Sequence, residues 1–369
     1  MDDLTNIGMG ALPSPKDYRD IALSVAVEPV VTPLSFFVDI SKLPVWNQRK
    51  IGACVGHATG KYKQKLDELD DGTIYKHSAR FIYGVCKCID GFAGEGTYPR
   101  TSMKVVYDYG VPSEDILPND TTLDHETYVM SRKLENFVPY MAHAEKYKIA
   151  SYATVDVSTL DGFKQGIIAG NGMSTLVLVG PEWYTGIDGV ITWDSNRILP
   201  IRAPKSVISG HQVYVYGYED AQNNGAEDTK IFFLNSWSEN WADGGKGWFW
   251  WSEYKSFIKE AFTAVDIPQK LLDDAHNLPP PDAFKYEFKN VLTYGMESAE
   301  VKALQKALQL DGVFPATQSI TGFYGGITAN SVLAFQKKYN VASLAELLLL
   351  RGRRVGPKTL AKLNELFNK

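Results

Sequence analysis

The sequence predicts an α+β protein with a mainly helical half, then a mainly β half, and finally a small separate helical domain. Residues 54–150 have the pattern of helices, whereas residues 150–268 contain β-rich runs such as 174–179 and 212–216. Because the helices precede the strands, we expect two subdomains with a cleft between them rather than alternating units around a parallel sheet. Three consecutive prolines at 279–281 cannot continue a helix or a central strand and indicate a linker.

Length and composition bound the class of protein. A chain of 369 residues suits two or three folding units of roughly 100–200 residues each. Basic residues number 38 and acidic residues 43, and without a basic stripe nucleic acid is not an expected partner. No apolar run approaches the roughly 20 residues of a membrane-spanning helix. Residues 1–6 have neither a basic nor an apolar region, so we expect no secretory signal in this sequence.

The chain is expected to divide into four segments: an N-terminal extension (1–35), a large domain (36–268), a linker (269–294) and a helical C-terminal domain (295–369).

One helix is predicted to begin near Cys54. Apolar residues recur at three- and four-residue steps along one stripe, and Asp70-Asp71-Gly72 ends the pattern. The stripe consists of Val55, Ala58, Tyr62, Leu66 and Leu69. Cys54 would then lie in the first turn, where free backbone N–H groups and the positive end of the helix dipole favour a thiolate.

A reactive thiol also needs a base. His211 begins one strand-like run, and Asn235 ends another, where its side chain could hold the imidazole in one tautomer. His57, three residues after Cys54, is a rival base, but it shares the rigid helix with the nucleophile and is poorly directed. Cys86 and Cys88 lack the second pair that a zinc site needs, and we expect them to be buried helix residues.

Four motifs in order resemble the papain-like cysteine peptidases over about residues 11–265. Gln48 lies six residues before Cys54, and the Asn235-Ser236-Trp237 block precedes Trp241 and a Gly-Lys-Gly-Trp run at 245–248. Residues 37–40 resemble the family's mature N-terminal element, and residues 11–13 with 17–20 resemble the lead-in of its bacterial members. The resemblance implies a papain-like two-subdomain fold. Ile51, Val55 and Ser238 depart from the family pattern without removing a catalytic atom.

The resemblance also implies a mechanism. Cys54 attacks the peptide carbonyl, Gln48 and the Cys54 N–H stabilise the oxyanion, and His211 serves as base and acid. Asn235 orients the imidazole, while Trp237 shields that hydrogen bond from solvent. Neither a metal nor an organic cofactor is required. The residues expected to contact a protein or peptide substrate are Gly94, Gly96, Gly210 and Trp237.

Residues 297–369 predict a three-helix bundle. Gly325-Gly326-Ile327-Thr328 and Gly356-Pro357-Lys358-Thr359 both precede predicted helices, which suggests a weak internal repeat. Together with the segments 300–305, 321–325 and 334–336, these turns resemble the peptidoglycan-binding-like domain attached to many cell-wall enzymes. The alternative is a fused structural or docking unit.

The leading functional prediction is a cysteine endopeptidase held near the cell wall by its C-terminal domain, and therefore extracellular or wall-associated. Two alternatives stay open: a cysteine-type wall-peptide hydrolase of another kind, and an inactive wall-binding protein. We also hypothesise that residues 1–30 pack over the cleft, because Pro13, Pro15 and Pro29 favour an extended path.

Overall fold

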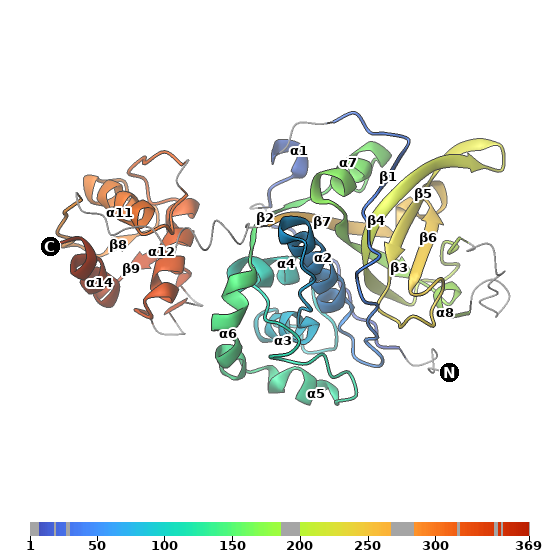
Figure 1. The fold of residues 1–369 in the computed structure, drawn as a ribbon, viewed down its shortest axis with the longest axis horizontal. Coiled ribbons are helices and arrows are strands. Elements are labelled where there is room, and N and C mark those ends of the chain that lie inside the picture. The colour runs from blue at the N-terminus through green and yellow to red at the C-terminus, as the bar shows by residue number, and fades with distance from the viewer. Residues whose placement is uncertain are drawn as a thin grey trace. The chain divides into compact units, whose positions relative to one another are not determined.

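The computed structural model describes residues 7–17, 20–26, 30–185, 200–266, 284–315, 318–342, 346–347 and 350–368 (Figure 1). The chain forms two compact units, Met1–Gln269 and Lys270–Lys369. Most of the expected linker, including its three prolines, lies outside the described residues. No helix in the described part of the chain is both long and apolar enough to cross a bilayer.

The first half of the larger unit is mainly helical, as the sequence predicts. Its helices are α1 (Leu23–Ala26), α2 (Cys54–Asp71), α3 (Ala79–Ile89), α4 (Pro99–Asp108), α5 (His125–Tyr128) and α6 (Val138–Ala144). Short 3-10 turns cover Met130–Arg132, Leu134–Phe137 and Glu145–Tyr147. The predicted end of α2 is confirmed, because Gly72 takes a left-handed conformation with φ 79° and its N–H bonds to the carbonyl of Glu68.

The second half builds an antiparallel sheet. Its strands are β2 (Ile149–Thr154), β3 (Met173–Val179), β4 (Ser209–Asn223), β5 (Ala226–Leu234), β6 (Lys246–Trp250) and β7 (Ile258–Asp266), joined by β1 (Ser35–Phe37) from the start of the chain. Among the described residues the strand order is β2-β7-β3-β4-β5-β6, with β1 on β4. The remaining helices of this unit are α7 (Leu160–Gly170), α8 (Glu182–Thr185), α9 (Trp251–Tyr254) and a 3-10 turn at Lys255–Phe257.

Strand β4 contributes side chains to two hydrophobic cores. Val213 and Val215 pack into the core that includes α7, whereas Tyr214 and Tyr216 pack into the core that includes α2, α3 and α4. This alternation follows from the two-residue period of a strand. Figure 1 shows α2 beside this sheet, and α2 contacts β4.

The pairing of β4 with β5 contains a bulge at Tyr216. The register shifts between Val215, which pairs with Phe233, and Gly217, which pairs with Phe232. The carbonyl of Tyr216 accepts a hydrogen bond from the N–H of Val38. Gly217 has no room for a side chain, because an added Cβ would lie 2.5 Å from the ring of Phe37.

The smaller unit contains α11 (Ala299–Leu310), α12 (Gly326–Lys338), α14 (Pro357–Phe367) and the paired strands β8 (Leu292–Thr293) and β9 (Arg354–Val355). Its core is separate from those of the larger unit and includes Leu304, Val332, Phe335 and Leu363.

Two buried glutamines make matching contacts in the smaller unit. Gln305 donates to a carbonyl 18 residues further along the chain and to the hydroxyl of Thr328, 23 residues along. Gln336 makes the same two contacts at the same separations, ending at Thr359. The two turns that the sequence suggests as a repeat are therefore held by equivalent side chains.

Candidate active site

Cys54 is the first residue of α2 and is completely buried. Backbone N–H groups point at its sulfur from Gln212, from Gly10 and from the first turn of the helix itself. Burial nevertheless dominates and raises the pKa of the thiol to about 11. In this enclosed state the cysteine is a neutral thiol at neutral pH.

His211 lies near the start of β4, and its Nε2 is 2.7 Å from Oδ1 of Asn235, the residue that follows β5. Burial lowers the pKa of His211 to about 4, and the bond to Asn235 opposes that shift. Its other nitrogen, Nδ1, has no hydrogen-bond partner among the described residues. The thiol and the imidazole are therefore not hydrogen-bonded to each other in this state.

Aromatic rings enclose the His211 imidazole. The Trp237 ring lies 4.7 Å from it and the Trp183 ring 5.7 Å, measured between centroids. Trp237 is completely buried and stacks on Tyr184. The Trp237 ring thus lies against the imidazole inside the protein rather than on an open surface.

Gln48 is completely buried next to the same residues. The hydroxyl of Ser236 donates to its Oε1 over 2.6 Å, which fixes the orientation of the amide. Its Nε2 then donates to the carbonyl oxygens of Gly8, at 2.6 Å, and Ile51, at 3.1 Å. The amide donor that could stabilise an oxyanion is thus already bonded to a backbone carbonyl of the chain itself.

Residues 7–15, the crossing segment, run between the two halves of the larger unit. On the helical side, Thr97 donates from its N–H to the Gly10 carbonyl over 2.8 Å and accepts from the Leu12 N–H over 3.0 Å. On the β side, the Ala11 N–H bonds to the carbonyl of Gly210. Ala11 and Thr97 form a parallel bridge. The crossing segment therefore spans the expected cleft directly over the candidate catalytic residues.

Glycines allow this close approach. A Cβ on Gly10 would lie 2.5 Å from Cα of Gly96 and 2.6 Å from the carbonyl oxygen of Gly52. One on Gly96 would meet the Gly10 carbonyl at 2.1 Å, and one on Gly210 would meet the Ala11 carbonyl at 2.1 Å. The backbones are in direct contact, which leaves no space for another peptide.

Two polar contacts hold the end of the crossing segment. The backbone N–H and hydroxyl of Ser14 both donate to Oε1 of Glu260, at 2.8 and 3.0 Å. Glu260 is largely buried, and burial raises the pKa of its carboxyl. Further on, Asp20 forms an ion pair with Arg100 at 2.5 Å.

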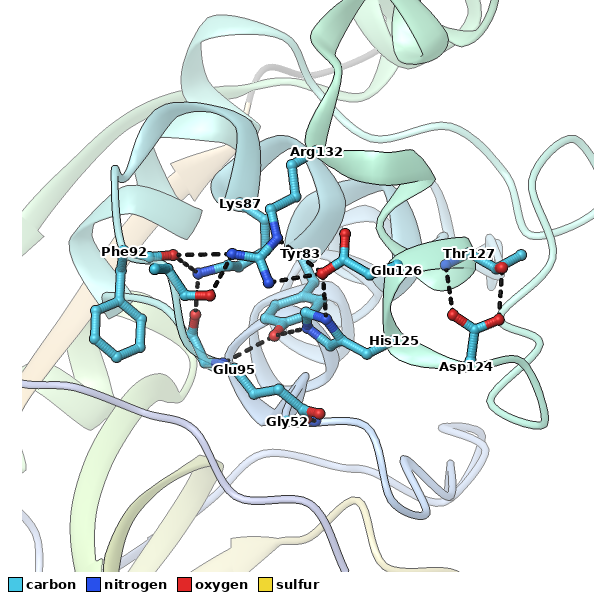
Figure 2. A network of polar contacts seen from close by, with 12 residues as sticks. Gly52, Tyr83, Lys87, Phe92, Glu95, Asp124, His125, Glu126, Thr127 and Arg132 are labelled. Atoms are coloured by element: carbon cyan, nitrogen blue, oxygen red, sulfur yellow. Dashed lines mark hydrogen bonds and ion pairs between the residues drawn. The ribbon is translucent and has the colours of Figure 1, made fainter.

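A polar network holds the loop of residues 91–96, here called the glycine loop (Figure 2). The ammonium of Lys87 donates to the carbonyl oxygens of Phe92 and Gly96 at 2.7 and 2.8 Å. Arg132 reaches the carbonyl of Ala93 and pairs with Glu126 at 2.8 Å. These cations satisfy carbonyls that loop geometry leaves without backbone partners.

The same network reaches the segment that precedes the helix of Cys54. Glu95 accepts from the N–H of Gly52, two residues before Cys54, at 2.9 Å. The Tyr83 hydroxyl bonds to His125 and accepts from the N–H of Gly96 (Figure 2). Arg132 closes a run of three residues with φ between 49° and 55°, an unusual left-handed turn without glycine. The glycine loop is thereby tied to the segment that precedes α2.

The expected substrate residues have different surroundings. Gly96 and Gly210 contact the crossing segment through their backbones. Gly94 is exposed, and a Cβ added there would meet the ring of Phe92. The rival base His57 is buried, with its Nδ1 2.9 Å from the carbonyl oxygen of Ala53. The two remaining cysteines lie on α3, Cys86 buried and Cys88 partly buried.

Sequence reasoning did not find several residues of this site. Thr97 and Gln212 act through their backbones, which leave no side-chain signal. Ser236 belongs to a motif that the sequence did reveal, but its bond to Gln48 joins residues 188 apart. The departure at Ser238 also has a physical meaning, because its φ is 73°, a left-handed conformation that glycine adopts more easily than serine.

No protein-family model matches this sequence, and no curated sequence is similar enough to count as a relative. Solved structures do share its fold. Xylellain, a cysteine protease from Xylella fastidiosa, is 22% identical, with 71% of this chain and 97% of that chain covered and a TM-score of 0.56. The chain thus has the α+β fold of papain-like cysteine proteases, with a helical N-terminal part and an antiparallel sheet.

Two further structures are more distant. Procathepsin L 3 of Tenebrio molitor is 17% identical, with coverage of 71% of this chain and 77% of that chain and a TM-score of 0.47. Bromelain protease from Ananas comosus is 16% identical, with coverage of 64% and 100% and a TM-score of 0.47.

Proposed function

We propose that this protein is a cysteine endopeptidase with Cys54 as nucleophile and His211 as base. One observation carries the proposal: His211 is fixed by a 2.7 Å bond to Asn235, while the N–H of the adjacent Gln212 points at the Cys54 sulfur. A helix N-terminus, an oriented imidazole and an amide donor are the parts that thiol-mediated acyl transfer needs. Their arrangement on a papain-like fold supports a peptide substrate.

The proposed reaction proceeds in two stages. The Cys54 thiol passes its proton to Nδ1 of His211, and the thiolate adds to the scissile carbonyl, whose oxyanion accepts from Gln48 Nε2 and the Cys54 N–H. As the C–N bond breaks, His211 returns the proton to the leaving amine and a thioester remains. His211 then takes a proton from water, the hydroxide displaces the thiolate, and the acid product leaves.

We propose that the form described above is latent. Gln48 Nε2 already bonds to the Gly8 carbonyl, and Gln48, Cys54 and His211 are completely buried. Burial also raises the pKa of Cys54 to about 11 and lowers that of His211 to about 4, so both groups are neutral near pH 7. Displacing the crossing segment admits water, favours the charged pair and vacates the oxyanion position.

Peptide hydrolysis by the full chain carrying Gly10→Arg tests the proposed activity. Arginine cannot fit between Gly96 and Gly52, so the crossing segment should leave without any change to the catalytic residues. We expect cleavage of an unfolded protein substrate by Gly10→Arg, and none when Cys54→Ala is added. Cleavage that persists with Cys54→Ala, or an inactive Gly10→Arg protein whose Cys54 reacts freely with an alkylating reagent, would contradict the proposal.

We further propose that the smaller unit binds peptidoglycan, in line with its sequence resemblance. A cavity of about 220 Å³ in this unit is lined by Gln336, Glu346, Arg354, Lys358 and Thr359 among others. The two cations suit the free carboxylates of wall peptides. Cosedimentation of the full chain with purified peptidoglycan should fall at least fivefold in Arg354→Glu/Lys358→Glu.

The matched control is Lys285→Glu/Lys289→Glu, which changes charge equally on the same unit without lining the cavity. Equal loss in both variants would mean that attraction to the wall is only a net-charge effect, and no cosedimentation of the unaltered chain would refute wall binding.

A further inference from the structure

A small cavity lies behind the candidate catalytic pair, on the side of β4 that faces α2. Its volume is about 10 Å³, close to the least that holds one water molecule. The residues that line it include His57 and Lys61 from α2, Gln212 from β4, and Asn235 with Ser236 after β5. The cavity therefore joins the helix of the proposed nucleophile to the residue that orients the proposed base.

Three of these side chains carry a buried polar atom without a hydrogen-bond partner among the described residues. The atoms are His57 Nε2, Gln212 Oε1 and Asn235 Nδ2. Leaving such groups unsatisfied in a protein interior is costly, and buried water is the usual partner where a cavity permits it.

The existing hydrogen bonds determine which of the three atoms donate. His57 Nδ1 faces the carbonyl of Ala53, which can only accept, so Nδ1 carries the proton of the neutral ring and Nε2 is an acceptor. Gln212 donates from Nε2 to the hydroxyl of Ser174 over 2.8 Å, which leaves Oε1 as a second acceptor. Asn235 Oδ1 faces His211 and the N–H of Ser236, so Nδ2 is the only donor of the three.

We propose that one water molecule binds in this cavity, accepts a hydrogen bond from Asn235 Nδ2 and donates to His57 Nε2 and Gln212 Oε1. Through this water, His57 is a positioning residue that sets the tautomer of His211. The water makes three bonds, the usual number for buried water. The assignment of His57 rests on the proposed peptidase function, although the water site does not.

The polarity of the cavity explains the effect on the base. With both of its protons given to His57 and Gln212, the water can only accept, so it requires the NH2 group of Asn235 to face it, the same orientation that the Ser236 N–H favours by donating to Oδ1. The carbonyl end of Asn235 then faces His211, whose Nε2 must carry a proton to bond there. His211 Nδ1 is left as the lone-pair nitrogen, the form that a base for Cys54 requires.

Lys61 is the other titratable residue that lines the cavity. Its Nζ donates to the carbonyl of Pro44 and lies 3.7 Å from the centroid of the Trp46 ring, and burial lowers the pKa of this amine well below its ordinary value. Burial lowers the pKa of His57 to about 4, with a smaller effect of Lys61 in the same direction. His57 thus stays neutral, and remains an acceptor, above about pH 4.

Nitrogen NMR of the full chain with 15N-labelled histidine tests this inference without requiring turnover. At pH 7 we expect His211 to be the Nε2–H tautomer in the unaltered protein and in His57→Gln, whose Oε1 can replace the lost acceptor. In His57→Leu we expect the Nδ1–H form to appear. His143→Leu, which changes a histidine outside the site, is the control. An unchanged His211 tautomer in His57→Leu would overturn the proposal.

Kinetics in the full chain carrying Gly10→Arg give a second readout. Losing one partner of a buried polar group should lower kcat about tenfold in His57→Leu, with KM unchanged within twofold and kcat restored within threefold in His57→Gln. The loss should vanish when Asn235→Ala is already present, because both changes act through one amide. Additive losses would overturn the positioning role.

If His57→Leu does not fold, Gln212→Met removes the water's other acceptor and should shift the same tautomer. A tautomer shift in a protein that cleaves no peptide would refute the proposed function and leave the water site intact. Peptide cleavage with an unchanged tautomer and kcat in His57→Leu would refute this inference alone.

Discussion

Ala11 and Thr97 form a parallel bridge, while the N–H of Ala11 also bonds to the carbonyl of Gly210 on the opposite side. One residue of the crossing segment thus joins the helical half to the β half. The contacts involve backbone atoms, and the Ala11 side chain is buried in one cluster with Cys54, Val55 and Leu176. Substitution of the flanking glycines would remove the space on which the contacts depend.

Displacing the crossing segment should expose the cysteine. In the full chain, Gly10→Arg should increase the rate of Cys54 alkylation by iodoacetamide at pH 7.5 at least 100-fold, because the thiol becomes hydrated and its pKa falls from about 11. Mass spectrometry of the alkylated peptides measures the rate at each of the three cysteines.

Gly326→Arg serves as the control, since a side chain at Gly326 meets nothing within 4 Å. Equal Cys54 reactivity in the two variants and in the unaltered chain would show that the segment does not protect the site.

The contact between Ser14 and Glu260 should stabilise the closed segment. Glu260→Leu removes the one oxygen that accepts from both the N–H and the hydroxyl of Ser14, at a cost of about 1–3 kcal/mol, and should accelerate Cys54 alkylation roughly 5- to 100-fold. Glu253→Leu, which breaks only the surface ion pair with Arg202, should not change the rate. An unchanged rate of Cys54 alkylation in Glu260→Leu would show that the contact between Ser14 and Glu260 does not hold the crossing segment closed.

Acid should destabilise the larger unit through its buried histidines. His211 and His57 have pKa values lowered from 6.5 to about 4, so between these values the unfolded chain binds protons that the folded chain does not. Their contribution to stability is complete above pH 6.5 and is lost as the pH falls toward 4, on the order of 2 kcal/mol per histidine by pH 4.5.

Urea unfolding followed by tryptophan fluorescence measures this loss selectively, because all eight tryptophans precede the smaller unit. His57→Gln should show a shallower decrease in unfolding free energy between pH 6.5 and 4.5 than the unaltered chain. Parallel curves would mean that His57 is not held neutral by burial.

Ser238→Gly should stabilise the larger unit. Serine is held there at φ 73°, a strained conformation that glycine adopts freely, so the unfolding free energy should increase by about 0.5–1 kcal/mol. Ser41→Gly, at an exposed position that is not left-handed, should instead cost a few tenths of a kcal/mol through chain entropy. A loss of stability in Ser238→Gly would show that the bond between the Ser238 hydroxyl and the Asn240 N–H outweighs the strain.

The main elements of the larger unit could be predicted because their signals are local. The apolar stripe after Cys54 and the closing Gly72 define α2, and the alternation at 212–216 defines part of β4. The four consecutive aromatic residues 248–251 are all less than 10% exposed. The bulge at Tyr216 could not be predicted, because it depends on pairing with distant strands.

The candidate site was only partly accessible to such reasoning. Gln48, Cys54, His211 and Asn235 stand in motifs, whereas the contacts that block them come from backbone atoms of the crossing segment. The prolines motivate the hypothesis that residues 1–30 pack over the cleft, and of the described residues in that range 7–15 cross it. The surroundings of His57 could not be predicted either, because the residues that line the cavity beside it come from separate parts of the chain.

The bulge at Tyr216 makes the alignment of β4 with β5 specific, and the positions of His211 and Gln212 depend on that alignment. A slip of one residue would exchange the environments of His211 and Gln212, since neighbouring strand residues face opposite sides. The extra residue at Tyr216, with Gly217 pressed against Phe37, fits only one alignment. The same slip would exchange the core positions of Val213 and Tyr214, so the alignment that packs the two cores is also the one that places the proposed base beside Cys54.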